Sequence, residues 1–358
     1  MIKLNSKWKE GVVIVLQLKN RLVENSEAIR RGDKLGYLCG YIEEACFLKK
    51  YKESEYSTDW WIFPGNDKFG KNINGNPIFV VFKDFDDLNC IDLNLIHILR
   101  NDASNSKKYA CILVMIENDK FCVYDLDVID DKIEKKLIYS IEFNDVKINS
   151  FKDTKYKEML EKRNTKEEKS FKNGRYCRAI KLIKEKGLLG GKEEKEFLEK
   201  RALQIFKQES FNKYHGLMNN ECGANLDIIG KDDKGRLIYY EVKFKPVKSW
   251  TEIGVNRAEV CAAGIFNEKK MLSKNVVLCN LDSEKGDTLN EDKKWDILLN
   301  LLEKKSIDQL SWVVADFDKL EGKGTKKRYD KDRKKFNDVK NNEEFTHFFY
   351  PLTEYDNL

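Results

Sequence analysis

Three charged residues in two short apolar segments are the residues of this chain best placed to do chemistry. Asp227 lies in the first segment, and Glu241 and Lys243 lie in the second. Successive side chains of a strand point to opposite faces, so Glu241 and Lys243 share one face and Val242 points to the other. Two carboxylates and an ammonium group that converge form a cation site beside a group able to hold water or phosphate.

The sequence also predicts how the two segments meet. Residues 225–229 and 236–244 are rich in Ile, Leu, Tyr, Val and Phe, which favour strands. The run 231–235, Lys-Asp-Asp-Lys-Gly, has the composition of a turn. We therefore expect an antiparallel hairpin that brings Asp227 close to Glu241.

The motif resembles the active-site signature of a known enzyme superfamily. Asp227, thirteen intervening residues and then Glu241-Val242-Lys243 resemble the motif of the PD-(D/E)XK nucleases, which include restriction endonucleases. Leu226 stands where these enzymes often have proline. The resemblance implies a metal-dependent endonuclease, similar to a type II restriction endonuclease, that hydrolyses DNA phosphodiester bonds and leaves 5′-phosphate and 3′-hydroxyl ends.

The resemblance also implies a role for each residue. Asp227 and Glu241, with the backbone carbonyl of Val242, would bind Mg²⁺, which prefers hard oxygen ligands. Lys243 would orient or deprotonate the attacking water and offset the charge that grows on the phosphate. Many members of the superfamily add a glutamate from the first core helix. Glu199 is the candidate for this position here, with Glu196 as a competitor, and the alternative is a solvated helix glutamate that pairs with a nearby lysine.

An acid followed two residues later by lysine is not specific by itself, because 35% of the chain is charged. The other copies lie in polar runs or on predicted helix surfaces, whereas Glu241 and Lys243 interrupt an apolar strand. Charges in such a strand are costly unless they are paired or used. The alternative is an edge strand whose charges face solvent and prevent edge-to-edge pairing. The other copies are Glu167/Lys169, Glu193/Lys195, Asp232/Lys234, Glu268/Lys270 and Glu303/Lys305.

The elements around the motif predict an α/β (α+β) fold with the αβββαβ core that restriction endonucleases have. An amphipathic pattern predicts a helix over 193–208, and 211–218 is a candidate first strand. A Ser-x-x-Glu capping box at 249–252 predicts the start of a helix that ends near Phe266. The pattern then predicts a strand at 275–281, a helix at 295–302 and a strand at 310–317.

We expect a separate amino-terminal α+β domain over 1–150, a charged linker or exposed helix over 151–175, and the nuclease-like domain over 176–358. The first part has candidate helices at 8–22 and 34–51, followed by strands at 77–82, 108–116, 120–129 and 136–143. Asn118-Asp119 predicts a hairpin turn. The aromatic run 59–66 either packs in a core, which we favour, or stacks on bases. Recognition, regulation or dimer contact is the expected role of this part.

Composition limits the remaining possibilities. Nine cysteines with no Cys-x-x-Cys pair favour reduced thiols over a disulfide framework or a structural zinc site. Only His97, His215 and His347 are present, which disfavours an HNH nuclease or a Ser-His-Asp hydrolase. No signal peptide or apolar run of about eighteen residues is apparent, so we expect a cytoplasmic protein.

The net charge of +5 permits binding to nucleic acid without requiring it. The basic run 319–340 either contacts phosphates or forms a solvated loop. The expected partners are duplex DNA and a second copy of the chain, with no membrane. The alternatives are a nuclease of the same fold that acts on RNA or requires an activating ligand, and a non-catalytic DNA-binding protein.

Overall fold

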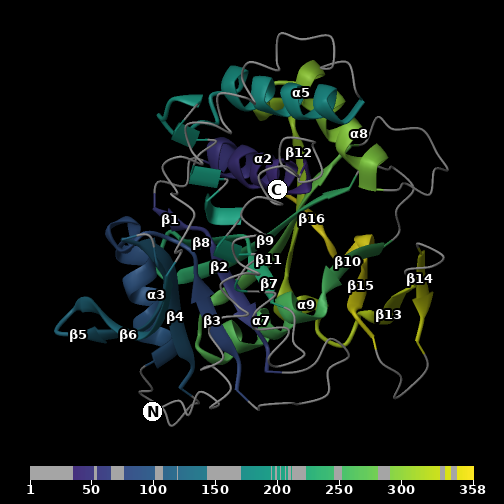
Figure 1. Ribbon diagram of the computed structural model, residues 1–358. Coiled ribbons are helices and arrows are strands. Elements are labelled where there is room, and N and C mark those ends of the chain that lie inside the picture. Colours follow the sequence, from purple (N-terminus) through teal and green to yellow (C-terminus); the bar gives the residue numbers. More distant parts are fainter. Residues whose placement is uncertain are drawn as a thin grey trace.

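The computed structural model describes most of the chain after the first 34 residues. Its described ranges are 35–51, 55–65, 76–100, 108–118, 120–142, 171–194, 196–197, 200–201, 203–205, 207–208, 211, 223–245, 252–280, 291–330, 335–339 and 345–358. The predicted helix at 8–22, most of the predicted linker, the candidate strand after Phe211 and His215 lie outside these ranges. The fold is a mixed α+β structure with three sheets (Figure 1).

The first sheet carries the motif and has the strand order β1-β8-β9-β11-β12-β16. Strands β8 and β9 pair antiparallel as predicted, whereas β9 and β11 run parallel and are joined by a crossover that contains helix α7. The turn between β8 and β9 places Gly235 at a φ of 76°, a conformation that favours glycine. The strands are β1 (Tyr56–Ser57), β8 (Ile228–Lys231), β9 (Leu237–Lys245), β11 (Leu272–Cys279), β12 (Ser311–Asp316) and β16 (Asp356–Asn357).

The second sheet has the order β6-β5-β4-β3-β2-β7 and continues directly from the first. Strand β1 leads into β2, and β7 leads into β8, so one antiparallel ribbon passes from one sheet into the other. Strand pairs thus join segments of the two predicted domains, and the division into separately folding units stays a prediction. The strands are β2 (Trp60–Phe63), β3 (Ile78–Val81), β4 (Ala110–Glu117), β5 (Lys120–Ile129), β6 (Lys132–Glu142) and β7 (Ala224–Leu226).

Three hydrophobic clusters hold these layers together. Helices α2 (Leu35–Tyr51), α5 (Phe171–Glu185) and α8 (Glu291–Lys304) cover one face of the first sheet. Helices α3 (Cys90–Arg100) and α7 (Arg257–Glu268) pack where the other face of that sheet meets the second sheet. A third cluster, which includes Phe211, covers the outer face of the second sheet. Burial of these apolar faces is the main favourable term in folding.

A buried polar network fixes the ribbon where it changes sheets. The Asp92 carboxylate of α3 accepts hydrogen bonds from Trp60 Nε1 at 2.7 Å and from Lys83 Nζ at 2.8 Å. Ser57 also donates to Asp92, and Asp92 is fully buried. Charges buried in this way are tolerated because they are paired and hydrogen-bonded. The network connects α3 to β1 through Ser57 and to β2 through Trp60.

The third sheet has the order β10-β15-β13-β14, and it corrects two predictions. Glu252 begins strand β10 (Glu252–Asn256), because Ile253 and Val255 are buried alternately and β10 pairs with β15 (His347–Pro351). The helix predicted from the capping box begins later, at Arg257. In the described part of the basic run, the end of α9 (Phe317–Leu320) and the paired strands β13 (Thr325–Asp330) and β14 (Lys335–Asp338) stand in place of the loop considered as one alternative.

Most other predicted elements are confirmed. The helix at 34–51 is α2, the hairpin around Asn118 joins β4 to β5, and the strand at 275–281 is β11. The described residues between 194 and 208 are helical. Trp60 and Trp61 are buried, which confirms core packing for this pair. The eight described cysteines are all free thiols.

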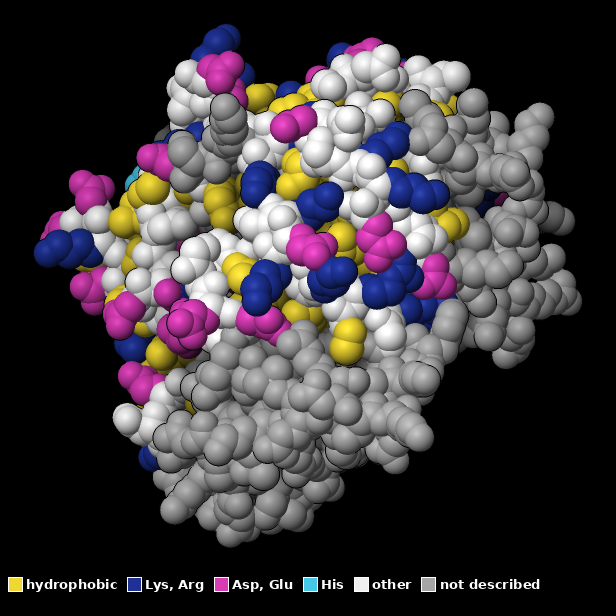
Figure 2. Space-filling view, turned by 90° about the horizontal axis from the view of Figure 1, so that it is seen from above, with side chains coloured by type: hydrophobic (Ala, Val, Ile, Leu, Met, Phe, Trp, Pro, Cys, Tyr) yellow, Lys and Arg dark blue, Asp and Glu magenta, His cyan; other side chains and the backbone are white. Residues whose placement is uncertain are grey.

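Charges of both signs cover the face above the helical layer. Figure 2 shows this face from above, where Lys and Arg side chains lie among Asp and Glu. Arg178 of α5 contacts Glu303 of α8 at 2.9 Å and Asp296 at 3.8 Å. These pairs connect α5 and α8, and exposed pairs of this kind contribute little to stability. No helix in the described ranges combines the length and the apolar character required to cross a membrane.

Candidate functional site

The site forms where the ribbon passes between the sheets. Ser57 pairs with Ile229 in the first sheet, and Trp60 pairs with Leu226 in the second. The same register places Asp59 opposite Asp227, and both residues lie between paired strands rather than inside one. A break of this kind frees side chains from the regular alternation of a strand. Asp59 and Asp227 therefore face each other at a point where the hydrogen-bonded ladder of the ribbon is interrupted.

Asp227 is connected to the second half of the motif by a hydrogen bond. Its Oδ2 accepts from the backbone N–H of Val242 at 2.8 Å, and its Oδ1 accepts from Asn225 Nδ2 at 2.9 Å. The side chain is buried, with 8% of its surface exposed. The predicted approach of Asp227 to strand β9 is therefore confirmed. The N–H of Val242 makes this contact, and a role for the Val242 carbonyl stays a prediction.

Glu241 lies in the middle of β9 and is completely buried. Tyr239 donates a hydrogen bond to Glu241 Oε2, and Lys243 Nζ forms an ion pair with Oε1. The opposite face of β9 packs Tyr240, Val242 and Phe244 against the helical layer. Glu241 and Lys243 thus share the face of β9 opposite to Val242, as strand alternation predicts. The solvent-facing edge strand considered as the alternative is wrong, because β9 lies between β8 and β11.

Lys243 connects β9 to helix α7. Its ammonium group contacts Glu241 and lies 3.2 Å from Glu259 Oε1. Glu259 also accepts from the Asn256 backbone N–H at 2.8 Å, which completes the capping box of α7. Sequence reasoning missed Glu259 because the capping box was placed seven residues too early. The signal was available, since Asn256 and Glu259 have the same spacing as Ser249 and Glu252.

A helix glutamate does approach this group, and it comes from α2. Burial raises the pKa of Glu44 to about 8, with Arg201 opposing the rise and Asp59, Glu43 and Glu241 adding to it. Glu44 therefore lies near enough to Glu241 for their charges to interact. The predicted residue, Glu199, lies outside the described residues, and its competitor Glu196 is exposed. No motif or spacing in the sequence indicates that α2 packs against β9.

The carboxylates of this group hold protons unusually strongly. Burial raises the pKa of Asp227 well above its ordinary value, and Glu44 and Glu259 raise it further against the opposing Lys243. Burial likewise raises the pKa of Glu241, and Asp227 and Glu259 add to the rise. Burial alone would lower the pKa of Lys243, but the surrounding carboxylates outweigh it and raise that pKa. Shifted groups that interact in this way are typical of functional sites.

Buried polar atoms without partners lie beside Glu241. Asn275 of β11 is opposite Glu241 in the parallel ladder and is fully buried. Within the described part of the chain, neither side-chain atom of Asn275 has a hydrogen-bond partner, and Glu241 Oε1 has only its ion pair. Such atoms cost free energy unless water or an ion satisfies them. The arrangement therefore has the capacity to bind a water molecule or a hydrated ion.

The described part of the chain holds no complete metal-binding cluster. In the described ranges, no group of three or more His, Cys, Asp or Glu side chains is arranged to hold a metal ion. Asp227 and Glu241 are two carboxylates, which is the number that a protein often supplies to Mg²⁺, with water and substrate phosphate completing the shell. The donor chemistry thus suits a hard cation, although Lys243 contacts one of the donor oxygens.

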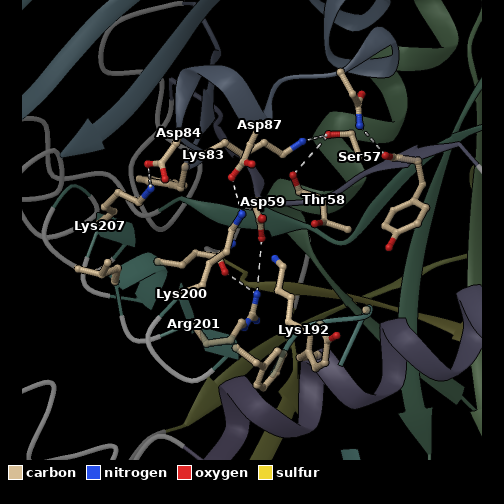
Figure 3. A pocket seen from close by; sticks show the side chains of 18 of the residues that line it. Ser57, Thr58, Asp59, Lys83, Asp84, Asp87, Lys192, Lys200, Arg201 and Lys207 are labelled. Atoms are coloured by element: carbon tan, nitrogen blue, oxygen red, sulfur yellow. Dashed lines mark hydrogen bonds and ion pairs between the residues drawn. The ribbon is translucent and has the colours of Figure 1, made fainter. Parts of the chain in front are cut away.

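A cavity of about 880 Å³ lies on the other side of Asp59 (Figure 3). Asp59 lines it, and so do Lys200 and Arg201 of the helical segment 194–208. Arg201 lies 3.7 Å from Asp59 and above the ring of Tyr41, with 4.9 Å between the guanidinium carbon and the ring centroid. Arg201 thus connects the cavity wall to the carboxylate group.

Comparison with protein-family models, curated proteins and solved structures gives no match to this chain. The geometry and chemistry of the site itself are therefore what indicates a function for this protein.

Proposed function

We propose that this protein is a metal-dependent endonuclease that hydrolyses DNA phosphodiester bonds at the group formed by Asp227, Glu241 and Lys243. One observation supports this proposal most strongly. Two carboxylates and an ammonium group from the two arms of one hairpin, with the spacing of the PD-(D/E)XK motif, lie close together: Asp227 bonds to the Val242 N–H, and Lys243 pairs with Glu241. The unpartnered polar atoms beside them are groups that a bound water or hydrated ion would satisfy.

The surrounding elements support the finer fold proposal, a restriction-endonuclease-like core. A helix packs on β9, an antiparallel hairpin carries the motif, and a second helix connects β9 to a parallel strand. These are the parts expected of such a core, in which α2 takes the place of the first helix and α7 that of the second. In this assignment the first helix comes from the segment predicted to belong to another domain.

The side chains have separate roles in the proposed reaction. Mg²⁺, when bound by Asp227 and Glu241, would supply Lewis-acid polarisation of the phosphate and a bound water of lowered pKa. Lys243 is 25% exposed, so its ammonium group is able to reach a phosphate oxygen or the attacking water. Glu259 would keep Lys243 charged and oriented. Because burial raises the pKa of Glu44 to about 8, this side chain would add negative charge that favours cation binding only at alkaline pH.

The test uses variants that remove one charge and keep the shape of the side chain. We expect Asp227→Asn and Glu241→Gln to abolish Mg²⁺-dependent cleavage of plasmid DNA and to leave thermal unfolding nearly unchanged. Asp233→Asn serves as the matched control, because Asp233 is exposed in the turn of the same hairpin. It should cleave like the original protein.

The alternative is a structural ion network in a DNA-binding protein without catalytic activity. It is favoured by the complete burial of Glu241 and its contacts with Tyr239 and Lys243. In that case neither the original protein nor any variant would cleave DNA, and Glu241→Gln would lower the unfolding temperature. Sequencing the ends of any cleaved DNA would also show whether 5′-phosphates are formed.

A further inference from the structure

The cavity has walls from five parts of the chain and none of the motif residues. It is surrounded by Tyr41 of α2, the segment 55–59, the segment 82–91, Ile116 and Asn118 at the turn between β4 and β5, and the described residues of 189–207. Its volume of about 880 Å³ falls within the range of small-molecule sites, roughly 300–1,000 Å³. The cavity is large enough for a nucleotide.

Basic side chains dominate one wall. Lys192, Lys200 and Arg201 point from that wall toward the opposite one, which holds Asp59 and Asp87 (Figure 3). Lys83 and Lys207 also line the cavity. Ion pairs satisfy part of this charge: Lys200 contacts Asp87, and Arg201 lies 3.7 Å from Asp59.

Lys207 is a buried cation whose counterion lies in water. Its side chain is 7% exposed, whereas the carboxylate of its partner Asp84, 3.5 Å away, belongs to a side chain that is 63% exposed. Burial lowers the pKa of Lys207, and Asp84 and Asp59 oppose this only in part. A buried charge with so weak a partner is costly, and an anionic ligand would compensate it.

Two further observations indicate that the wall accepts an anion. Burial and then the neighbouring Lys200 lower the pKa of Lys192, so two ammonium groups repel each other at the cavity. The buried donors Arg201 Nε and Gln204 Nε2 have no hydrogen-bond partner among the described residues. Both residues line the cavity. Phosphate oxygens accept several hydrogen bonds at once and would satisfy such donors.

An aromatic side chain lies at the rim. Tyr56 is 40% exposed, which makes it one of the exposed large hydrophobic residues in the described chain, and it lines the cavity. A cavity lined by both an exposed tyrosine ring and several basic side chains has the combination that proteins use to bind a base and its phosphate together.

We propose that the cavity binds a nucleotide phosphate, with Lys192, Lys200 and Lys207 holding the phosphate and Tyr56 stacking on the base. The same chemistry is present in a free nucleotide and in one nucleotide of a single strand. Binding here does not depend on the proposed nuclease activity. One consequence does depend on it: because Asp59 lines the cavity and lies opposite Asp227, a bound strand would continue toward the carboxylate group.

The experiment measures binding by isothermal titration calorimetry without divalent metal, so that no cleavage occurs. The probes are inorganic phosphate, adenosine 5′-monophosphate and a six-nucleotide single-stranded DNA. We expect the nucleotide or the oligonucleotide to bind, and Lys192→Ala/Lys200→Ala to lower its affinity at least tenfold. Tyr56→Leu should lower the affinity for the probes that carry a base about tenfold and leave the affinity for phosphate unchanged.

The control is Lys181→Ala/Lys304→Ala, which removes the same charge from exposed positions of α5 and α8. It should bind like the original protein. Tight binding of the monophosphate would identify a free nucleotide as the ligand, and binding of the oligonucleotide alone would identify a strand. The proposal is overturned if neither the monophosphate nor the oligonucleotide binds. It is also overturned if the cavity variants bind these two probes as well as the control does. Asp227→Asn should retain binding, which separates this result from the nuclease test.

Discussion

Asp59 and Asp227 lie opposite each other where one antiparallel ribbon passes from the first sheet into the second. Asp59 adopts a φ of 74°, in the left-handed region, and its carbonyl accepts from the Phe82 N–H at 3.0 Å. This backbone conformation interrupts strand pairing on one side of the ribbon. Because residues directly opposite each other in an antiparallel pair share a face, the register brings the two aspartates together, and the interruption takes both out of the hydrogen-bonded ladder.

The left-handed residue gives a prediction about stability. Aspartate tolerates positive φ better than alanine does, and glycine has no Cβ to oppose it. We expect Asp59→Ala to be less stable than Asp59→Gly by about 1 kcal/mol in urea unfolding. Both variants lose the ion pair with Arg201, so the difference in their stability measures the cost of the left-handed backbone conformation alone. Equal stability of the two variants would show that the left-handed conformation costs nothing here.

The contact between Lys243 and Glu259 gives a prediction about positioning. Glu259→Gln removes the charge that holds Lys243 and weakens the cap of α7, whereas Asn256→Ala weakens the cap alone. A cap of this kind contributes about 1 kcal/mol. If the proposed nuclease function holds, Glu259→Gln should lower cleavage at least tenfold, and Asn256→Ala should lower it less than threefold.

The pH profile separates positioning from a general loss of structure. Loss of a carboxylate beside Lys243 lowers the pKa of the ammonium group, so the alkaline limb of the cleavage profile should shift to lower pH in Glu259→Gln. In Asn256→Ala the profile should keep its position. An identical shift in both variants would contradict a specific role for Glu259.

Strand alternation and turn composition were enough to predict the hairpin and the shared face of Glu241 and Lys243, because these features depend on neighbours in the chain. The position of Glu44 was not predictable in this way. Its helix reaches β9 from nearly 200 residues earlier in the chain, and no local pattern encodes that packing. Asp59 was missed for the same reason, since only the pairing of β2 with β7 brings it to Asp227.

The capping box shows a different limit. Ser249 to Glu252 and Asn256 to Glu259 fit the same pattern, and a sequence offers no means to rank them. The buried alternation of Ile253 and Val255 against β15 decides in favour of a strand before the helix. Tertiary pairing thus overrides a local signal, which is common for short segments.

Two glycines ten residues apart should respond to alanine with opposite signs. A Cβ at Gly254 of β10 would lie 2.8 Å from Cζ of the buried Phe349 ring, so we expect Gly254→Ala to destabilise the protein by roughly 1–3 kcal/mol. A Cβ at Gly264 of α7 meets nothing within 4 Å, and Gly264→Ala should stabilise the helix by up to about 1 kcal/mol. Urea unfolding of both variants measures the difference, and a stabilising Gly254→Ala would show that Phe349 moves freely.

His347 should make the protein sensitive to acid. Burial lowers the pKa of His347 to about 4, with Lys243 and Lys245 lowering it further against the opposing Glu259. The unfolded chain has a histidine pKa of about 6.5. Between these values the unfolded state binds more protons than the folded state, so stability falls as the pH falls from 6.5 to 4. We expect His347→Gln to reduce this acid-dependent decrease in the free energy of unfolding by about 1 to 3 kcal/mol.

Glu44 should act in the opposite direction and over a wider range. Burial raises its pKa to about 8, whereas an unfolded glutamate titrates near 4.5. The folded state binds more protons between these values, so this group makes stability fall as the pH rises from 4.5 to 8. Glu44→Gln should therefore be more stable than the original protein at pH 8 and nearly equal to it at pH 4. Measuring urea unfolding of both variants from pH 4 to 8 separates the two effects, because His347→Gln changes only the acidic end. A Glu44→Gln variant that loses stability at pH 8 would show that the carboxylate is ionised and paired in the folded protein.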